Sequence, residues 1–316
     1  MRFLIYGAGA LGQALACLLA ADGHRVDLVL RPRFLTALKN EGLTVTGIFG
    51  HYRATPTQLG LLEDLSGREG RDYEYVLLTT KTYNTAAALE TLAALPGCSC
   101  PVVSLQNGCG NLEQLAQRLG PSRILAARVI TGFAIERPGT VRITVSADKV
   151  HIGGCERGFI PQAARSLAAA LDHAGLPSTA VADIHQSLFA KLLYNCALNP
   201  LGAILGVHYG ALADSDQTRS IMDRVIRETF AVITAMGGTT PWPDADSYRQ
   251  VFYDQLVPAT ANHRSSMLQD LEQHKPTEVE AMVGYVAARG REHGVATPCC
   301  ELLAALVRFK QQGVAG

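Results

Sequence analysis

The stretch that decides the fold is the N-terminal one, MRFLIYGAGALGQALACLLA, residues 1–20. Residues 1–6 predict a buried strand and residues 11–22 predict a helix. The loop between them reads G-x-G-x-x-G, with the residues Gly7, Ala8, Gly9, Ala10, Leu11 and Gly12. Its glycines permit a tight turn, a close approach of the backbone to a pyrophosphate, and close packing of the helix on the strand. We therefore expect a dinucleotide at the helix N-terminus, where free N–H groups favour an anion. The alternative is a glycine-rich turn without a ligand.

Length and composition describe an ordinary globular protein. The 316 residues suffice for about two domains, and 48% hydrophobic with 18% charged residues argues against disorder. Lys plus Arg and Asp plus Glu both number 28, so the net charge is zero. This argues against nucleic acid or an anionic membrane as the main partner and is compatible with a homodimer. The glycines of residues 3–21 argue against reading that uncharged run as a signal peptide or a membrane span.

The eight cysteines show neither a C-x-x-C motif nor a Cys/His cluster with zinc spacing. We therefore expect reduced cysteines in a cytoplasmic protein, and no metal site.

The pattern of segments changes along the chain. Up to about residue 180, strand-like and helix-like segments alternate, which predicts an α/β Rossmann domain over 1–180 with a parallel sheet covered on both faces. Residues 181–316 predict an all-helical domain. The expected strands are 1–6, 25–30, 75–79, 101–105, 124–130, 141–145 and 151–152. The helices expected in the second domain include Ile184–Leu198, Ser266–Glu272, Thr277–Gly290 and Cys300–Gln312.

The end of the second strand bears on the choice of cofactor. NAD sites place Asp or Glu there, but this chain reads Leu30-Arg31-Pro32-Arg33, and Asp27 lies inside the strand. Arginines suit a 2′-phosphate, so we predict NADP, with Arg31 as the first candidate. The alternative is a surface arginine without a ligand.

One predicted helix carries a narrow polar stripe. Ser187, Lys191, Asn195 and Asn199 are spaced four apart, and their neighbours are mostly apolar. A solvent-facing stripe is normally wide and charged, so this one indicates a lined cleft, with an ordinary solvent-facing stripe as the alternative.

Six motifs in order give the chain a specific resemblance. They are GAGALG (7–12), LLTTK (77–81), QNG (106–108), KLLYNCALNP (191–200), SSMLQD (265–270), and TEVEAMVGY (277–285) before HGVATP (293–298). Over nearly its whole length the chain resembles the ketopantoate reductase family. The resemblance implies NADPH-dependent reduction of a small branched 2-keto acid, ketopantoate, to pantoate on the way to pantothenate.

The resemblance also implies residue roles. Gly7 to Gly12 would hold the pyrophosphate. Lys81 and Asn107 would contact the cofactor, and the backbone near Gly132 would line its site. Asn107 would also reach the substrate. Lys191 matches the catalytic lysine that donates the proton, and Asn195, Asn199 and Ser266 match substrate-binding residues. Glu278 matches a catalytic glutamate that contacts the cofactor, although from the residues alone it could instead pair with Lys191.

One departure from the family concerns the substrate. Tyr209 stands where studied members place a substrate-binding asparagine, and Gly202 stands where Thr or Ser is more usual. Two alternatives therefore remain: a reductase of another small 2-keto or 3-hydroxy acid, and a dinucleotide-binding regulator without catalysis. Retention of the lysine, asparagine, serine and glutamate motifs speaks against the regulator.

Overall fold

The computed structural model describes residues 1–313, and the chain divides into two compact units. Of the described residues, the first contains 1–107 and 111–184, and the second contains 108–110 and 185–313. The change from strands to helices predicted near residue 180 therefore lies close to the point where the chain passes into the second unit.

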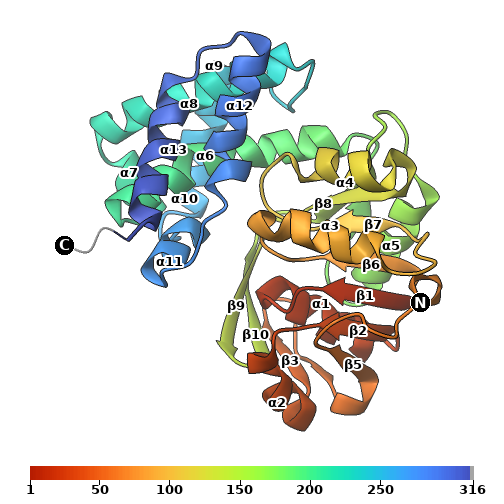
Figure 1. Ribbon diagram of the computed structural model, residues 1–316. Helices are drawn as coiled ribbons and strands as arrows, with labels where there is room; N and C mark the ends of the chain where they lie inside the picture. Colours follow the sequence, from red (N-terminus) through yellow and green to blue (C-terminus); the bar gives the residue numbers. More distant parts are fainter. Residues whose placement is uncertain (314–316) are drawn as a thin grey trace. The chain divides into compact units, whose positions relative to one another are not determined.

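The first unit contains two sheets and five helices (Figure 1). Its strands are β1 (Arg2–Tyr6), β2 (Arg25–Val29), β3 (Leu43–Gly47), β4 (Tyr52–Ala54), β5 (Leu59–Leu62), β6 (Tyr75–Leu78), β7 (Val102–Ser104), β8 (Ile124–Arg128), β9 (Thr131–Arg137), β10 (Thr140–Ser146), β11 (Val150–Gly154) and β12 (Ser178–Ala180). Its helices are α1 (Ala10–Ala21), α2 (Pro32–Glu41), α3 (Thr85–Ala93), α4 (Asn111–Leu119) and α5 (Gln162–His173).

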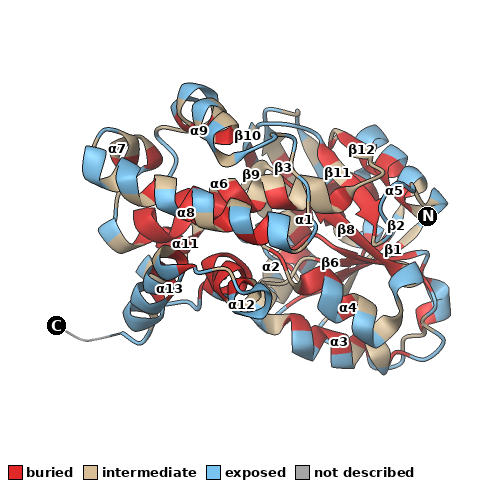
Figure 2. Cartoon of the chain, turned by 90° about the horizontal axis from the view of Figure 1, so that it is seen from above, coloured by how far each residue is buried: buried red, intermediate tan, exposed pale blue. Residues whose placement is uncertain are grey.

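The larger sheet has eight strands in the order β12-β11-β8-β7-β6-β1-β2-β5. The strands from β8 to β5 are parallel, and β11 pairs with β8 in the antiparallel sense. Helices α1 and α5 contact each other, as do α3 and α4, and the two pairs lie on opposite faces of the sheet (Figure 2). The predicted Rossmann-type α/β fold is confirmed.

The smaller sheet, β4-β3-β10-β9, is a finding that the sequence analysis did not predict. It packs against α1, which the large sheet covers on its other side. Nine consecutive residues of α1, from Gly12 to Ala20, are buried as a result. Burial on all sides explains why the N-terminal helix is apolar all round except at Gln13.

The second unit is built from helices around α6 (Figure 1). They are α6 (Ile184–Leu205), α7 (Tyr209–Ala213), α8 (Asp216–Ala235), α9 (Ala245–Val251), α10 (Val257–Ala259), α11 (Ser266–Glu272), α12 (Val283–His293) and α13 (Pro298–Gln311). Helix α6 is long and apolar enough to cross a membrane, but 67% of its most apolar window is buried inside the protein. Helix α6 is therefore a core helix of this unit.

Two helix predictions were wrong in their bounds. Helix α6 does not end at Leu198 but continues through Pro200 to Leu205, because Leu201 and Ala203 are buried in the core. The predicted helix Thr277–Gly290 is interrupted at Met282, where a 3₁₀ turn over Val279–Ala281 meets the start of α12.

Candidate active site

The glycine loop has the backbone that its sequence predicts. Gly7 has φ of +121°, and a Cβ on it would lie 3.0 Å from the backbone nitrogen of Thr80. A Cβ on Gly12 would lie 1.9 Å from the carbonyl oxygen of Gly7. A Cβ on Gly9 would meet no described atom within 4 Å. A side chain on Gly7 or Gly12 would thus collide with the backbone of the protein, whereas Gly9 faces open space.

The N-terminus of α1 suits an anionic ligand. Gly9 is its N-cap, Ala10 and Leu11 begin the helix, and in the described chain no side chain caps it. Its first turn holds no acidic residue either. The first N–H groups of a helix have no partner within the helix, so these can bind a phosphate. The loop therefore fits the pyrophosphate of a dinucleotide.

Two side chains that the sequence analysis missed hold the loop in place. The fully buried amide of Gln13 donates from Nε2 to the Ala8 carbonyl at 2.8 Å and accepts from the Gly139 N–H at 3.2 Å. The hydroxyl of Thr79 donates to the Gly7 carbonyl at 2.7 Å. The one sequence signal for Gln13 is a polar residue inside an otherwise apolar helix.

Arg31 lies at the carboxyl end of β2, where it is the exposed N-cap of α2. The guanidinium of Arg33 stacks over the Phe34 ring, 4.7 Å from its centroid. Asp27 lies inside β2, as predicted, and accepts a 2.6 Å hydrogen bond from the Tyr73 hydroxyl. Its carboxylate is also 3.6 Å from the guanidinium of Arg68. The Asp27 carboxylate is thus bound to partners from outside β2, and the exposed charge at the end of this strand is that of Arg31.

The carboxyl ends of β6 and β7 carry a hydrogen-bond network. The buried Gln106 amide donates to the Thr80 carbonyl at 3.1 Å and to the Thr85 hydroxyl at 2.9 Å. Thr85 donates to Asn111, whose amide donates to the Asn107 carbonyl at 3.1 Å. This network fixes the backbone that presents Asn107. The sequence analysis quoted Gln106 but assigned it no role.

Two further predicted cofactor residues lie in the same unit. Lys81 follows β6 as the N-cap of a 3₁₀ turn over Thr82–Asn84. Gly132 lies on β9, and a Cβ there would come within 2.6 Å of the Thr144 hydroxyl. Gly132 therefore belongs to the small sheet.

The predicted polar stripe lies along α6 in the second unit. Lys191 is half-buried, and Asn195 and Asn199 are 7% and 4% exposed. A wide solvent-facing stripe would leave such amides exposed. The low exposure of both asparagines thus favours a role inside the protein or at a ligand.

Three of the motifs meet at Asn199. Its Oδ1 accepts a 2.5 Å hydrogen bond from the Tyr209 hydroxyl, and its Nδ2 lies 3.6 Å from the Met282 sulfur. Its carbonyl accepts a bond from the Ser265 hydroxyl at 3.4 Å. Burial raises the pKa of Tyr209 well above its ordinary value, so the phenol stays a neutral donor.

The two serines of the SSMLQD motif have different positions. Ser265 is fully buried and caps α11, accepting from the Leu268 N–H at 3.0 Å. Ser266, the predicted substrate residue, is half-buried as the first residue of α11. Ser265 therefore has a structural role, and Ser266 is the serine left near the surface of this unit.

Glu278 is 4% exposed and stands as the N-cap of the 3₁₀ turn over Val279–Ala281. Gly108, the last residue of the QNG motif, and Cys109, which follows it, pack on the same turn. Cys109 donates from its backbone N–H to the Ala281 carbonyl at 2.8 Å, and a Cβ on Gly108 would lie 2.2 Å from that oxygen. Gly108 and Cys109 therefore pack directly on the turn that follows Glu278.

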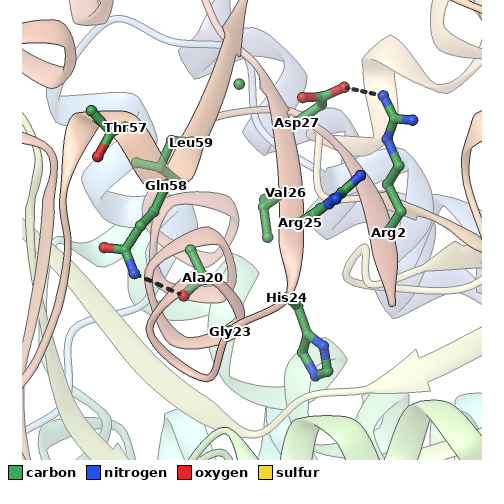
Figure 3. Close-up of a pocket in the computed structure, with 11 residues that line it drawn as sticks. Arg2, Ala20, Gly23, His24, Arg25, Val26, Asp27, Thr57, Gln58 and Leu59 are labelled. Atoms are coloured by element: carbon green, nitrogen blue, oxygen red, sulfur yellow. Dashed lines mark hydrogen bonds and ion pairs between the residues drawn. The ribbon is translucent and has the colours of Figure 1, made fainter.

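The first unit has a pocket of about 560 Å³ that none of the predicted site residues lines (Figure 3). Arg2, Arg25 and Leu59, which begin β1, β2 and β5, line it together with Gln58. Gln58 donates to the Ala20 carbonyl at 3.4 Å. Ligands of open parallel sheets bind beyond the carboxyl ends of the strands. This pocket at the amino ends is therefore not the expected cofactor site.

The fold and the loop define a Rossmann-type α/β protein with an added helical unit. Family models agree: residues 3–156 match "Ketopantoate reductase PanE/ApbA" and residues 183–311 match its C-terminal counterpart. The 2-dehydropantoate 2-reductase of Aquifex aeolicus is 35% identical over 311 residues, 98% of this chain and 97% of the relative. The chain belongs to the ketopantoate reductase family.

Solved structures share the whole architecture. The ketopantoate reductase of Ralstonia eutropha is 30% identical, with a TM-score of 0.85 and 99% of each chain covered. D-mandelate dehydrogenase, solved with NADH and anilino(oxo)acetate, is 25% identical, with the same TM-score and coverage. This fold therefore occurs in enzymes whose names give different substrates.

Proposed function

We propose that the protein is a 2-dehydropantoate 2-reductase, which reduces ketopantoate to pantoate with NADPH. Its family membership and the curated relative from Aquifex aeolicus support an oxidoreductase acting on this 2-keto acid. The single observation that carries the proposal is the stripe on α6, where the Lys191 ammonium shares a helix face with two buried asparagines.

The glycine loop from Gly7 to Gly12 would bind the pyrophosphate of the cofactor, and Arg31 would bind its 2′-phosphate. Lys81, Asn107, Gly132 and Glu278 would make further cofactor contacts. A bound reduced nicotinamide supplies the hydride for this reaction. The free N–H groups at the start of α1 and the open space at Gly9 support the pyrophosphate role.

Lys191 would act on the substrate carbonyl. Its ammonium stabilises the negative charge that develops on the carbonyl oxygen and then gives that oxygen a proton. The amides of Asn195 and Asn199 and the hydroxyl of Ser266 would hold the carboxylate and hydroxyl of the substrate, and Asn107 would reach it as well. These groups add no charge, so Lys191 supplies the positive charge of the proposed substrate site.

Replacement of Lys191 tests the proton donor. Lys191→Ala should lower kcat for ketopantoate by roughly 10²–10⁴-fold, the usual contribution of a general acid. The dissociation constant for NADPH should change little. Lys39→Ala removes an exposed lysine of α2 and serves as the matched control. Turnover of Lys191→Ala at the wild-type rate would remove Lys191 from the mechanism.

Arg31→Ala tests the choice of NADP. The variant should weaken NADPH binding by about 1.5–3 kcal/mol, the contribution of a charged hydrogen bond, and leave NADH binding nearly unchanged. Arg33→Ala is the matched control, since that guanidinium stacks over Phe34. Equal losses for NADPH and NADH, measured by fluorescence titration, would exclude a 2′-phosphate role.

A second candidate is a reductase of a different 2-keto acid, and the match to D-mandelate dehydrogenase with NADH favours keeping it. Oxidation of NADPH and of NADH should be followed with ketopantoate, with phenylglyoxylate and with a panel of other 2-keto acids. Turnover confined to ketopantoate with NADPH supports the first proposal. Turnover of another acid supports the second, and nucleotide binding without any turnover supports a regulator.

We also propose a cytoplasmic location and a homodimer. The burial of α6 supports the location, as does the finding that the eight cysteines of residues 1–313 form no disulfide. The mass of the protein in solution, measured by light scattering, tests the dimer.

A further inference from the structure

Two cysteine thiols face each other in the turn between α3 and β7. The sulfurs of Cys98 and Cys100 are 4.0 Å apart. Cys98 is half-buried and Cys100 is 9% exposed, and Gly97 and Ser99 beside them are exposed. A small oxidant can therefore reach Cys98, while the more buried Cys100 sulfur lies within 4.0 Å of it.

An arginine in a neighbouring turn forms hydrogen bonds with both cysteines. The Arg123 guanidinium donates from Nη2 to the Cys98 sulfur at 3.5 Å and to the Cys100 carbonyl at 3.3 Å. Gly70 supports the turn from another side, because a Cβ there would lie 2.2 Å from the Cβ of Cys98. The pair is thus a built cluster with a fixed cation.

The cluster makes the two thiols unequal. The hydrogen bond from Cys100 and the charge of Arg123 lower the pKa of Cys98, against the effect of its partial burial. The hydrogen bond with Cys98 and burial raise the pKa of Cys100. Cys98 is therefore the thiolate of the pair, and thiolates are the reactive form of cysteine.

The cluster is separate from the proposed cofactor site. Cys100 comes two residues before β7, and Arg123 comes directly before β8. Both therefore lie at the amino ends of the parallel strands, whereas the glycine loop, Lys81 and Asn107 follow the carboxyl ends.

We propose that Cys98 and Cys100 form a redox-active pair that hydroperoxides convert to a disulfide, with Arg123 holding the Cys98 thiolate. The inference does not depend on the proposed function.

The chemistry balances in two steps. The Cys98 thiolate attacks one oxygen of hydrogen peroxide, the O–O bond breaks, and Cys98 becomes a sulfenic acid while hydroxide leaves. The Cys100 sulfur then attacks the Cys98 sulfur, which forms the S–S bond and breaks the S–O bond, and the sulfenic oxygen leaves as water with the thiol proton of Cys100. The hydroxide of the first step takes up the proton that Cys98 lost. The dithiol loses two electrons, and the peroxide is reduced to water.

Closure needs a local movement only. The sulfur atoms must approach from 4.0 Å to the disulfide bond length of about 2.05 Å. The exposed Gly97 and Ser99 allow the turn to adjust.

Peroxide treatment of the full chain tests the pair. After exposure to about one equivalent of hydrogen peroxide, alkylation in denaturant and mass spectrometry should show the loss of two hydrogens at residues 98–100. Cys109 shares the tryptic peptide, so fragment ions must show it alkylated. Cys299 and Cys300 adjoin each other but have raised pKa values, so they should stay reduced and serve as an internal control.

Three variants separate the roles of Cys98, Cys100 and Arg123. Cys100→Ser should stop at a Cys98 sulfenic acid that dimedone traps, and Cys98→Ser should leave Cys100 reduced. Arg123→Gln should slow alkylation of Cys98 in the native protein by about tenfold, with unchanged circular dichroism. Oxidation of Cys98 no faster than that of Cys155, or a Cys98 rate unaffected by Arg123→Gln, would overturn the proposal.

Discussion

Asn199 is the residue at which the helical unit brings its motifs together. It lies on α6, accepts from Tyr209 at the start of α7, and its carbonyl accepts from Ser265 before α11. The Tyr209 hydroxyl occupies Oδ1, which fixes the orientation of the Asn199 amide. Tyr209, which stands where the resemblance predicts an asparagine, is therefore buried and bonded to a predicted substrate residue.

Tyr209→Phe tests this bond. The variant leaves the buried Asn199 oxygen without its donor, which should lower the free energy of unfolding by about 1–3 kcal/mol. If Asn199 holds the substrate, the KM for the keto acid should rise while kcat changes little. Urea denaturation and steady-state kinetics measure the two effects.

Tyr194→Phe is the matched control. Tyr194 lies on the same helix as Asn199, and its ring packs edge-on against that of Tyr209, but its hydroxyl bonds Thr260 at 2.6 Å. The control should lose stability without a change in KM. A KM raised equally in both variants would mean that Tyr209 acts only through the stability of the unit.

At the scale of elements, the strand–loop–helix unit β1–α1 and the stripe on α6 could be predicted, because local patterns encode both. The small sheet could not. Its strand β3 pairs with β10, about a hundred residues later, and short segments such as Tyr52–Ala54 show no clear alternation. The break at Met282 was also missed, and the carbonyl of Ala281 beside it accepts a hydrogen bond from the backbone of Cys109, which is distant in the sequence. Partners distant in sequence thus decide the elements that were missed.

The glycine loop gives a prediction at this scale, because its glycines differ in what surrounds them. Gly9→Ala places a methyl group in open space, so the thermal midpoint should stay unchanged, while binding of NADPH weakens by about tenfold or more. Gly12→Ala drives a methyl group into the Gly7 carbonyl, so both stability and binding should fall. Calorimetry and nucleotide titration measure the two effects. Unchanged NADPH affinity in Gly9→Ala would place the pyrophosphate elsewhere.

At the scale of the whole molecule, each unit has its own hydrophobic core. One core joins the large sheet, α1, α5 and the small sheet, and the other surrounds α6. Chains with two such units often depart from two-state unfolding. The only tryptophan, Trp242, packs on Tyr248 in the second unit at 4.6 Å between ring centroids. Its fluorescence therefore reports that unit, whereas far-UV circular dichroism reports both.

Fluorescence and circular dichroism together should separate the unfolding of the two units. Urea unfolding should give a fluorescence transition that differs from the circular dichroism curve. Leu77→Ala in β6 should destabilise the first unit, whose unfolding Trp242 does not report. Leu193→Ala in α6 should destabilise the second unit, whose unfolding Trp242 reports. Each variant should lower the free energy of unfolding of its unit by about 2–5 kcal/mol. NADP⁺ at a hundredfold excess over its dissociation constant should stabilise the first unit by about 2.7 kcal/mol and move the Trp242 transition less. NADP⁺ is the suitable ligand because it does not absorb the tryptophan emission. Coincident curves that shift together with NADP⁺ would instead show that the two units unfold as one, and that the nucleotide stabilises α6 as much as the glycine loop.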